Sequence, residues 1–450
     1  MISARDWNIV LAGECMIARP FSMHDDPEFL SVIEDLRESD VTYAHLEMNF
    51  GSFPELDWPS RGDWMASYMI AEPALAGEMA WAGIDMVSLA HNHSMDFGVS
   101  GMEATRRHCQ AAGLVCAGTG CDLEEAREPA YFESRKGRVA LVSVSTGNKG
   151  HEWAGLPKAS LRGRPGVNPL RVSMDYRIDA AAAAELRRMS EALGIGRTDR
   201  DGGIRLALPS GQSTRETVRF VPGDDFAIRS TLYPHDLAGN LRSIGEATHM
   251  ADLVMVAHHF NIAEGPRGDE PPGFARQFAH AAIDAGADIY IGHGWHKTLG
   301  IEIYKGSPIF YGMGNFISQS EFIRRVPYDS FEAFGHDIER LTTLNSAAEP
   351  LHPGMDAARE VWWSSALVRL TMDETGVREI RLHPVETGRN ADREAAILRP
   401  TGRAGHPRTE GRPRRADAGN AERVLTRIQR LSEPFGVTVA IEDGVGIIRL

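Results

Sequence analysis

The chain has little cysteine and no long apolar run, and both shortages limit what kind of protein it is. Only four of its 450 residues are cysteines, namely Cys15, Cys109, Cys116 and Cys121. Their spacing fits neither a zinc knuckle nor a disulfide framework, so we expect reduced thiols and a cytoplasmic location. The first residues lack the basic start and apolar stretch of a signal peptide. No segment has the length of a bilayer-spanning helix, and we expect no membrane partner.

Basic residues are also in deficit. The chain has 48 Lys and Arg against 62 Asp and Glu, which gives a formal net charge of −14. This balance argues against nonspecific binding to nucleic acid, and we expect no such partner. A site for an anionic substrate would therefore need local positive charge from metal ions or clustered arginines. Nothing in the composition indicates an oligomeric state.

Apolar runs of strand length alternate with segments of helical periodicity over most of the chain. Strands are expected at 8–12, 41–46, 86–90, 139–144, 253–257, 288–291 and 309–311. Helices are expected at 27–39, 71–82, 101–112, 236–249 and 274–285. This alternation is typical of an α/β protein with a mostly parallel sheet and helices outside it.

The alternation also suggests how the chain is divided. Residues 147–235 are rich in Gly, Pro, Arg and Asp, with one clear helix predicted at 180–193, and indicate an insertion. We therefore expect a core of two halves, a second insertion or lid, and a C-terminal region. The expected segments are 1–146 and 236–319 (the core halves), 147–235 (the first insertion), 320–360 (the second), 361–400 (a core hairpin) and 401–450 (a loop, a helix and short strands).

Several predicted strands are followed directly by side chains that can bind metal ions. The clearest case is the segment IYIGHGWH, in which an apolar run ends at Gly292 and His293 and His296 follow. Because the carboxyl ends of strands meet at one edge of an open α/β sheet, we expect such side chains to converge. Carboxylate, amide and imidazole groups suit Mn, Fe, Zn or Mg. The full set is Glu14, Glu47, Asn92 with His93, His258 with His259, and His293 with His296.

The motifs around these residues resemble those of the CapA-type family, named for poly-γ-glutamate capsule synthesis, which shares the calcineurin-like metallophosphatase fold. The similarity covers roughly residues 8–145 and 236–318. Its motifs are specific for the fold and uninformative about the substrate. They are GECMIAR at 13–19, HLE at 45–47, AHNHSMDFG at 90–98, HHFNIAE at 258–264, GHGWH at 292–296 and GMGNF at 312–316.

The resemblance implies a four-layer α/β/β/α sandwich with a dinuclear metal site at one edge of paired sheets. Three departures from the family pattern bear on that site. Glu14 stands where the family has Asp, His91 replaces the first Asn of its motif, and Phe260 and Asn261 replace Trp and Gly. By resemblance, the metal ligands are Glu14, Glu47, Asn92, His259, His293 and His296, and His93 occupies the catalytic position.

We expect a hydrolase that uses two divalent ions, Mn, Zn or Fe, to cleave an amide or ester-like bond of a small or peptide-like substrate. His93 or a neighbouring histidine such as His296 would protonate the leaving group. Asp96 would orient a histidine or stabilise its loop. One alternative is an epimerase that removes an α-proton from a peptide-like substrate. Another is a capsule synthesis component that binds polymer without turnover.

Three arginines in the first insertion form a further candidate site. Arg162, Arg164 and Arg171 lie close together in the sequence, around the tetrapeptide GRPG. They are either solvated residues of an exposed segment or an arginine clamp for a carboxylate or phosphate.

Overall fold

The computed structural model describes residues 6–56, 58–60, 68–207, 217–266, 268–319, 323, 328, 361–387 and 411–450. The second insertion expected at 320–360, apart from residues 323 and 328, lies outside this set, and so do residues 388–410. No helix among the described residues has the length and apolar character needed to cross a membrane.

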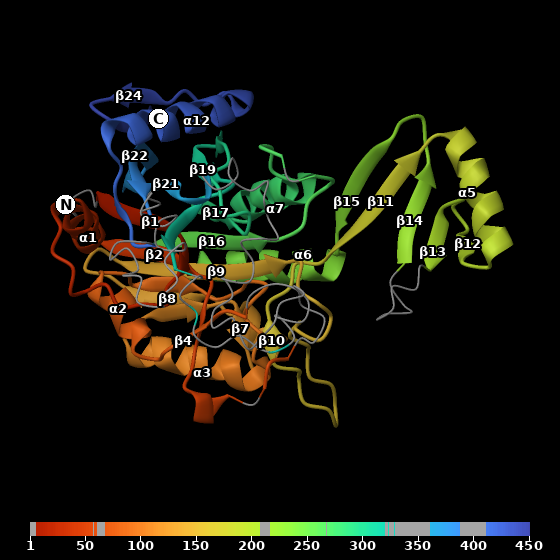
Figure 1. The fold of residues 1–450 in the computed structure, drawn as a ribbon, viewed down its shortest axis with the longest axis horizontal. Coiled ribbons are helices and arrows are strands. Elements are labelled where there is room, and N and C mark those ends of the chain that lie inside the picture. Colours follow the sequence, from red (N-terminus) through yellow and green to blue (C-terminus); the bar gives the residue numbers. More distant parts are fainter. Residues whose placement is uncertain are drawn as a thin grey trace, which may run out of the picture.

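Two large β-sheets form the centre of the molecule (Figure 1). In the first, β1 pairs in parallel with β2 and β20 and antiparallel with β21. Its ten strands are β1 (Trp7–Met16), β2 (Val41–Leu46), β5 (Met86–Ser88), β6 (Val115–Ala117), β20 (Asn315–Ser318), β21 (Ser364–Asp373), β22 (Gly376–Glu386), β23 (Arg414–Arg415), β24 (Ala440–Glu442) and β25 (Val445–Arg449). The six strands of the second are β8 (Ala130–Glu133), β9 (Arg138–Thr146), β16 (Leu253–Phe260), β17 (Ile289–His293), β18 (Ile301–Tyr304) and β19 (Ser307–Phe310).

The apolar side chains of each sheet divide between its two faces. In β1, Val10 and Ala12 pack with the helices α1 (Pro27–Arg37), α2 (Leu75–Trp81) and α3 (Gly98–Ala111). Ile9 and Leu11 instead enter a core shared with the second sheet. Helices α6 (Pro234–Ala247) and α7 (Gly273–Asp284) cover the outer face of the second sheet. The period of two along a strand thus gives each face its own core. The chain is a mixed α/β protein, as predicted.

The region between β9 and α6 contains a third sheet (Figure 1). Helix α5 (Ala180–Leu193) packs on one face of this sheet, against the sheet residues Ile178, Ile204 and Leu206. The helix has the predicted bounds, whereas the sequence did not indicate the sheet, because its strands are half exposed and carry many charges. The strands are β12 (Gly196–Thr198), β13 (Ile204–Ala207), β14 (Thr217–Pro222), β11 (Val172–Ile178) and β15 (Ala227–Leu232).

The C-terminal elements and the helix bounds refine the prediction. Strands β21 and β22 form the expected antiparallel hairpin, and α12 (Ala418–Ser432) packs on it through Val424 and Leu425. The helix expected from residue 71 begins at Leu75, because Ile70–Ala71 pairs as β4 with β3 (Asn49–Phe50). Other short elements are β7 (Thr119–Gly120), α4 (Leu123–Arg127) and β10 (Gly166–Val167).

An aspartate precedes each of four parallel strands and accepts a hydrogen bond from the backbone of the neighbouring strand. Without this bond, the neighbouring strand would have an unpaired backbone N–H near its first residue, and an unpaired N–H is costly when it is buried. The four bonds join Asp40 to Asn8 N (2.7 Å), Asp85 to Thr42 N (2.8 Å), Asp252 to Arg138 N (2.8 Å) and Asp288 to Val254 N (2.7 Å).

Two of these aspartates should make the stability of the fold depend on pH. Burial raises the pKa of Asp288, and likewise of Asp85, to about 6. A carboxyl whose pKa is higher in the folded than in the unfolded state stabilises the fold below its unfolded pKa, and this contribution is lost as the pH rises toward 6. We expect Asp288→Asn to gain up to about 3 kcal/mol of unfolding free energy relative to wild type between pH 4 and pH 7. Urea denaturation at the two pH values measures this change, and Asp85→Asn should behave in the same way. A difference that is independent of pH would contradict the prediction.

Candidate metal centre

The ends of β1, β2, β16 and β17, and the loop after β5, bring metal-capable side chains together at one edge of the two large sheets. Glu14, Glu47, His259 and His293 are each 1% exposed. Such burial of two carboxylates and two imidazoles is unusual without partners.

Glu14, Glu47 and His296 form the first group of potential ligands. One ligand atom from each lies within 4.8 Å of the others. His296 Nδ1 is 2.7 Å from Glu14 Oε2 and 3.7 Å from Glu47 Oε2, and it is also 3.0 Å from Asn315 Oδ1. We call this set the first triad.

His45, Glu47 and His259 form the second triad, by the same distance criterion. His45 Nε2 is 2.9 Å from His259 Nδ1, and His259 Nε2 is 2.7 Å from Asn92 Oδ1. Asn92 therefore adjoins this triad as an amide oxygen donor. Glu47 belongs to both triads, which is the position of a carboxylate that bridges two cations.

Sequence reasoning did not assign a role to His45, although its HLE motif was noted. The signal was present in the two-residue alternation of β2, which places Tyr43, His45 and the following Glu47 on one face. Tyr43 packs between the two sheets, so His45 points the same way. Its Nδ1 atom is 2.6 Å from Ser88 Oγ.

His293 lies next to the triads and belongs to neither. Its ring stacks on that of His45 with a centroid separation of 4.4 Å. Its Nε2 atom is 2.9 Å from the hydroxyl of Tyr43, and its Nδ1 atom has no hydrogen-bond partner among the described residues. His293 thus has one nitrogen held and one nitrogen available.

His93 and Asp96 form a pair beside Glu47. His93 Nδ1 is 2.8 Å from Asp96 Oδ2, an oxygen that also accepts the backbone N–H of Met69 at 2.8 Å. The opposite nitrogen, Nε2, is 3.9 Å from Glu47 Oε1. Asp96 therefore fixes the ring so that His93 Nε2 faces the triads.

The longer side chain of Glu14 keeps it in the first triad. Its Oε1 atom accepts hydrogen bonds from the backbone N–H groups of Gly294 (3.0 Å) and His296 (3.3 Å). These bonds hold the turn in which His296 has a φ of +54°, a conformation that costs about 1 kcal/mol or more in a non-glycine residue. Gly294 has a φ of +110°, and a Cβ there would meet Phe260 O at 2.3 Å. The extra methylene thus lets one oxygen bind the turn while the other faces His296.

The two neighbouring histidines of β16 point to opposite faces, as the alternation predicts. His259 enters the second triad, whereas His258 bonds Thr146 Oγ1 (2.8 Å) and Tyr290 OH (2.7 Å) on the helix-covered face. Cys15, next to Glu14, likewise joins the core under the helices.

Burial keeps most of these imidazoles neutral. It lowers the pKa of His45, His91 and His259 well below the usual value, and it lowers the pKa of His293 to about 4. Neutral imidazole is the form that binds metal ions.

The pKa values of the two carboxylates in the first triad are shifted in opposite directions. Burial raises the pKa of Glu47 well above its usual value, and the charge of Glu14 adds to this shift. Burial also tends to raise the pKa of Glu14, but the charge and hydrogen bond of His296 outweigh it, so this pKa lies well below its usual value. Burial lowers the pKa of His296, but Glu14 and Glu47 raise it to about 9.

The polar atoms of the site that lack donors have the chemistry that a cation requires. Glu47 Oε2 and His293 Nδ1 are buried and make no hydrogen bond to described residues, and Glu14 Oε2 has its ion pair with His296 as its contact. Buried acceptors without donors are rare in folded proteins, and a cation is one of the few groups that satisfies several at once. The mixture of carboxylate, amide and imidazole, with no thiolate, fits Mn, Zn or Fe.

Comparisons with known proteins identify the family of the chain. A family model described as "Bacterial capsule synthesis protein PGA_cap" matches residues 8–320. Two uncharacterized proteins of Sinorhizobium fredii are each 30% identical over 455 residues, covering 99% of this chain and 93% of the relative. The PGA biosynthesis protein CapA of Bacillus subtilis is 26% identical over 240 residues, or 53% of this chain and 44% of the relative. A probable polyglutamine synthesis accessory protein of Mycobacterium tuberculosis is 29% identical over 239 residues, which cover 52% of this chain and 46% of the relative. The family match spans more than half of the sequence, and the chain therefore belongs to the CapA-type family of bacterial capsule synthesis proteins.

Proposed function

We propose that this chain is a metal-dependent hydrolase that cleaves an amide or ester-like bond of a peptide-like substrate. The observation that carries the proposal is the pair of triads that share Glu47 and are buried except for the partly exposed His296, with His93 Nε2 facing the shared carboxylate. We further propose that the two facing sheets and their outer helices form the α/β/β/α sandwich of the calcineurin-like metallophosphatases, with the centre at its edge.

In this proposal the two triads supply the ligands of two cation positions. Glu14, Glu47 and His296 would hold one cation, and His45, Glu47, His259 and Asn92 the other. His293 would complete the second position through its free Nδ1 or stabilise the ring of His45. Two divalent cations in such a site polarise the substrate and make water nucleophilic near neutral pH.

His93 is the residue placed to transfer a proton. Asp96 holds Nδ1 of its ring, so Nε2 can donate a proton to the leaving group. A histidine oriented in this way by a carboxylate usually contributes about 10²- to 10⁴-fold to the rate. This pair favours bond cleavage, because cleavage of an amide needs an acid at the nitrogen that departs.

The relatives suggest the class of substrate. Their printed names refer to PGA biosynthesis and polyglutamine synthesis, and the corresponding proposal here is an amide bond in an acidic peptide-like chain. The same names favour a rival, in which this chain is a capsule synthesis component that binds such a polymer without cleaving it.

Oligoglutamate peptides incubated with the protein and Mn²⁺ in deuterated water test the proposal. Hydrolysis produces shorter peptides with new amino termini in proportion to the peptide lost, and mass spectrometry detects these products. Deuterium at an α-carbon of uncleaved peptide would instead establish the epimerase alternative. Peptide that binds but remains unchanged would support the binding component and contradict an enzymatic role on this substrate class.

A further inference from the structure

A cavity of about 450 Å³ lies away from the triads, between α4, the first residues of the inserted region and the start of α6. Among the residues that line it, four are arginines and only one, Asp236, is acidic. The arginines are Arg127, Arg164, Arg171 and Arg242. We call this cavity the arginine pocket. None of its lining residues belongs to either triad.

The single carboxylate of the arginine pocket is already fully used. Arg171 donates to Asp236 Oδ2 from Nε (2.6 Å) and to Oδ1 from Nη2 (2.7 Å). The backbone N–H of Arg171 adds a third bond at 3.0 Å, and Arg127 Nη2 reaches Oδ1 at 3.3 Å. One negative charge thus serves two guanidinium groups. At the rim, Arg164 adds a further positive charge, whereas Arg242 has an exposed pair with Glu246 at 4.0 Å outside the pocket.

Arg127 shows that this excess extends into the interior. It is 7% exposed, and its Nε atom has no hydrogen-bond partner among the described residues. Burial lowers the pKa of Arg127. Asp236 opposes that shift, whereas the charges of Arg242 and Arg171 add to it. A guanidinium does not lose its proton in proteins, so this buried charge is left short of compensation.

Arg171 is held in one orientation by two aromatic rings. Its guanidinium carbon lies 4.2 Å from the ring centroid of Tyr233 and 4.9 Å from that of Trp153. Both contacts fit cation–π packing. Asp236 already takes the Nε and Nη2 donors of this fixed guanidinium, so Arg171 offers an oxyanion its positive charge and its Nη1 donors.

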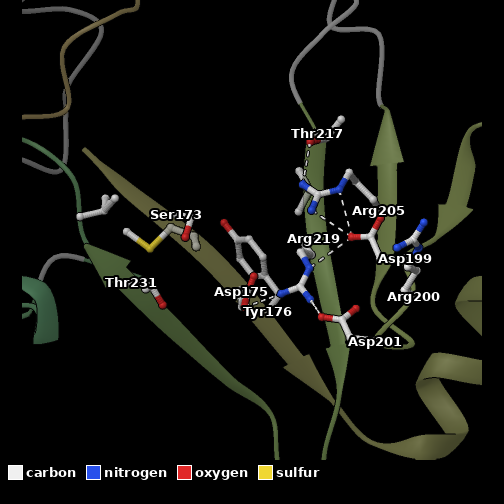
Figure 2. Close-up of a pocket in the computed structure, with 13 residues that line it drawn as sticks. Ser173, Asp175, Tyr176, Asp199, Arg200, Asp201, Arg205, Thr217, Arg219 and Thr231 are labelled. Atoms are coloured by element: carbon white, nitrogen blue, oxygen red, sulfur yellow. Dashed lines mark hydrogen bonds and ion pairs between the residues drawn. The ribbon is translucent and has the colours of Figure 1, made fainter. Parts of the chain in front are cut away.

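The larger cavity of the inserted sheet, of about 930 Å³, provides a contrast. Figure 2 shows Arg205 and Arg219 of that cavity turned toward aspartates. Arg205 Nη2 is 2.9 Å from Asp199 Oδ2, and Arg219 pairs with Asp175 at 2.6 Å and also with Asp201. Positive charge is balanced there, so that cavity gives no reason to expect an anion.

We propose that the arginine pocket binds an oxyanion, namely the phosphoryl or carboxylate group of a small ligand. Arg171 and Arg127 form its floor, and Arg164 and Arg242 approach the ligand from the rim. The excess of arginines over carboxylates, in a chain of net charge −14, is the observation that calls for an anion. This site is separate from the metal centre and does not depend on its proposed activity.

Isothermal titration of the full-length protein with inorganic phosphate, and separately with succinate, tests the site at constant ionic strength. Arg242→Ala and Arg164→Ala remove rim arginines without altering the buried bonds of Asp236. Arg188→Ala is the matched control: like Arg242, it is an exposed helical arginine paired with a nearby glutamate, and it lies outside the pocket. We expect each rim variant to weaken binding about fivefold or more, and the control to leave it unchanged.

The ratio of the two affinities in wild type identifies the ligand chemistry as phosphoryl or carboxylate, and either supports the site. The proposal is overturned if neither anion binds. It is equally overturned if the rim variants bind as tightly as the control, since the anion would then be held at the metal centre or elsewhere.

Discussion

Glu47→Gln is expected to abolish the two-cation site and with it nearly all activity. The substitution preserves the size of the side chain but removes the charge of the one carboxylate common to both triads. Each cation position loses an anionic ligand, and a neutral amide is a much weaker ligand for a divalent ion. We expect the bound metal to fall from two equivalents per chain to one or fewer, and turnover to fall by about 10³-fold or more.

Glu302→Gln provides the matched control for this change. Glu302 also pairs a carboxylate with a histidine, with its Oε1 atom 2.9 Å from His280 Nε2, but it lies on β18 away from the triads. Metal analysis by inductively coupled plasma mass spectrometry should find wild-type content in this control. If Glu47→Gln also retained two equivalents, Glu47 would not be the bridging ligand.

His93→Ala should be the next most damaging change, with a different signature. In the proposed mechanism His93 transfers a proton rather than holding a cation, so we expect the metal content of the variant to equal that of wild type while kcat falls by about 10²- to 10⁴-fold. The loss should be greatest for substrates with poor leaving groups, because these depend most on protonation. His280→Ala removes a carboxylate-paired histidine outside the centre and should leave kcat unchanged.

Asp96→Asn separates positioning from catalysis. The amide can still accept the Met69 N–H but no longer stabilises a charged His93 ring. We expect a smaller loss in kcat than in His93→Ala, accompanied by a displaced pH–rate profile. Loss of metal in either variant, or an unshifted profile in Asp96→Asn, would contradict these roles.

Strand alternation predicted much of the site. Along β1 and β16 it separates Glu14 from Cys15 and His259 from His258, and in the structure the two members of each pair point to opposite faces. The same rule applied to β2 would have found His45. It was missed because a histidine inside a strand, before the motif's carboxylate, has the pattern of an ordinary core residue.

Other features depend on contacts that no local pattern reveals. The sharing of Glu47 requires β1, β2, β16 and the turn after β17 to meet, and the pairing of His293 with Tyr43 requires the two sheets to face each other. The inserted sheet was not predicted because its strands lack an apolar run. The sequence offered Arg162, Arg164 and Arg171 either as solvated residues or as an oxyanion clamp. Arg164 and Arg171 line the pocket, whereas Arg162 is exposed and does not. Arg127 and Arg242 join the pocket through the packing of α4 and α6.

Anomalous X-ray diffraction from crystals of protein purified without chelators tests the central claim most directly. The account predicts two transition-metal peaks about 3.5–4 Å apart, one on each side of the Glu47 carboxylate, with Glu14 and His296 at one and His45 and His259 at the other. A single peak remote from Glu47, or no peak in protein that is fully active, would contradict it.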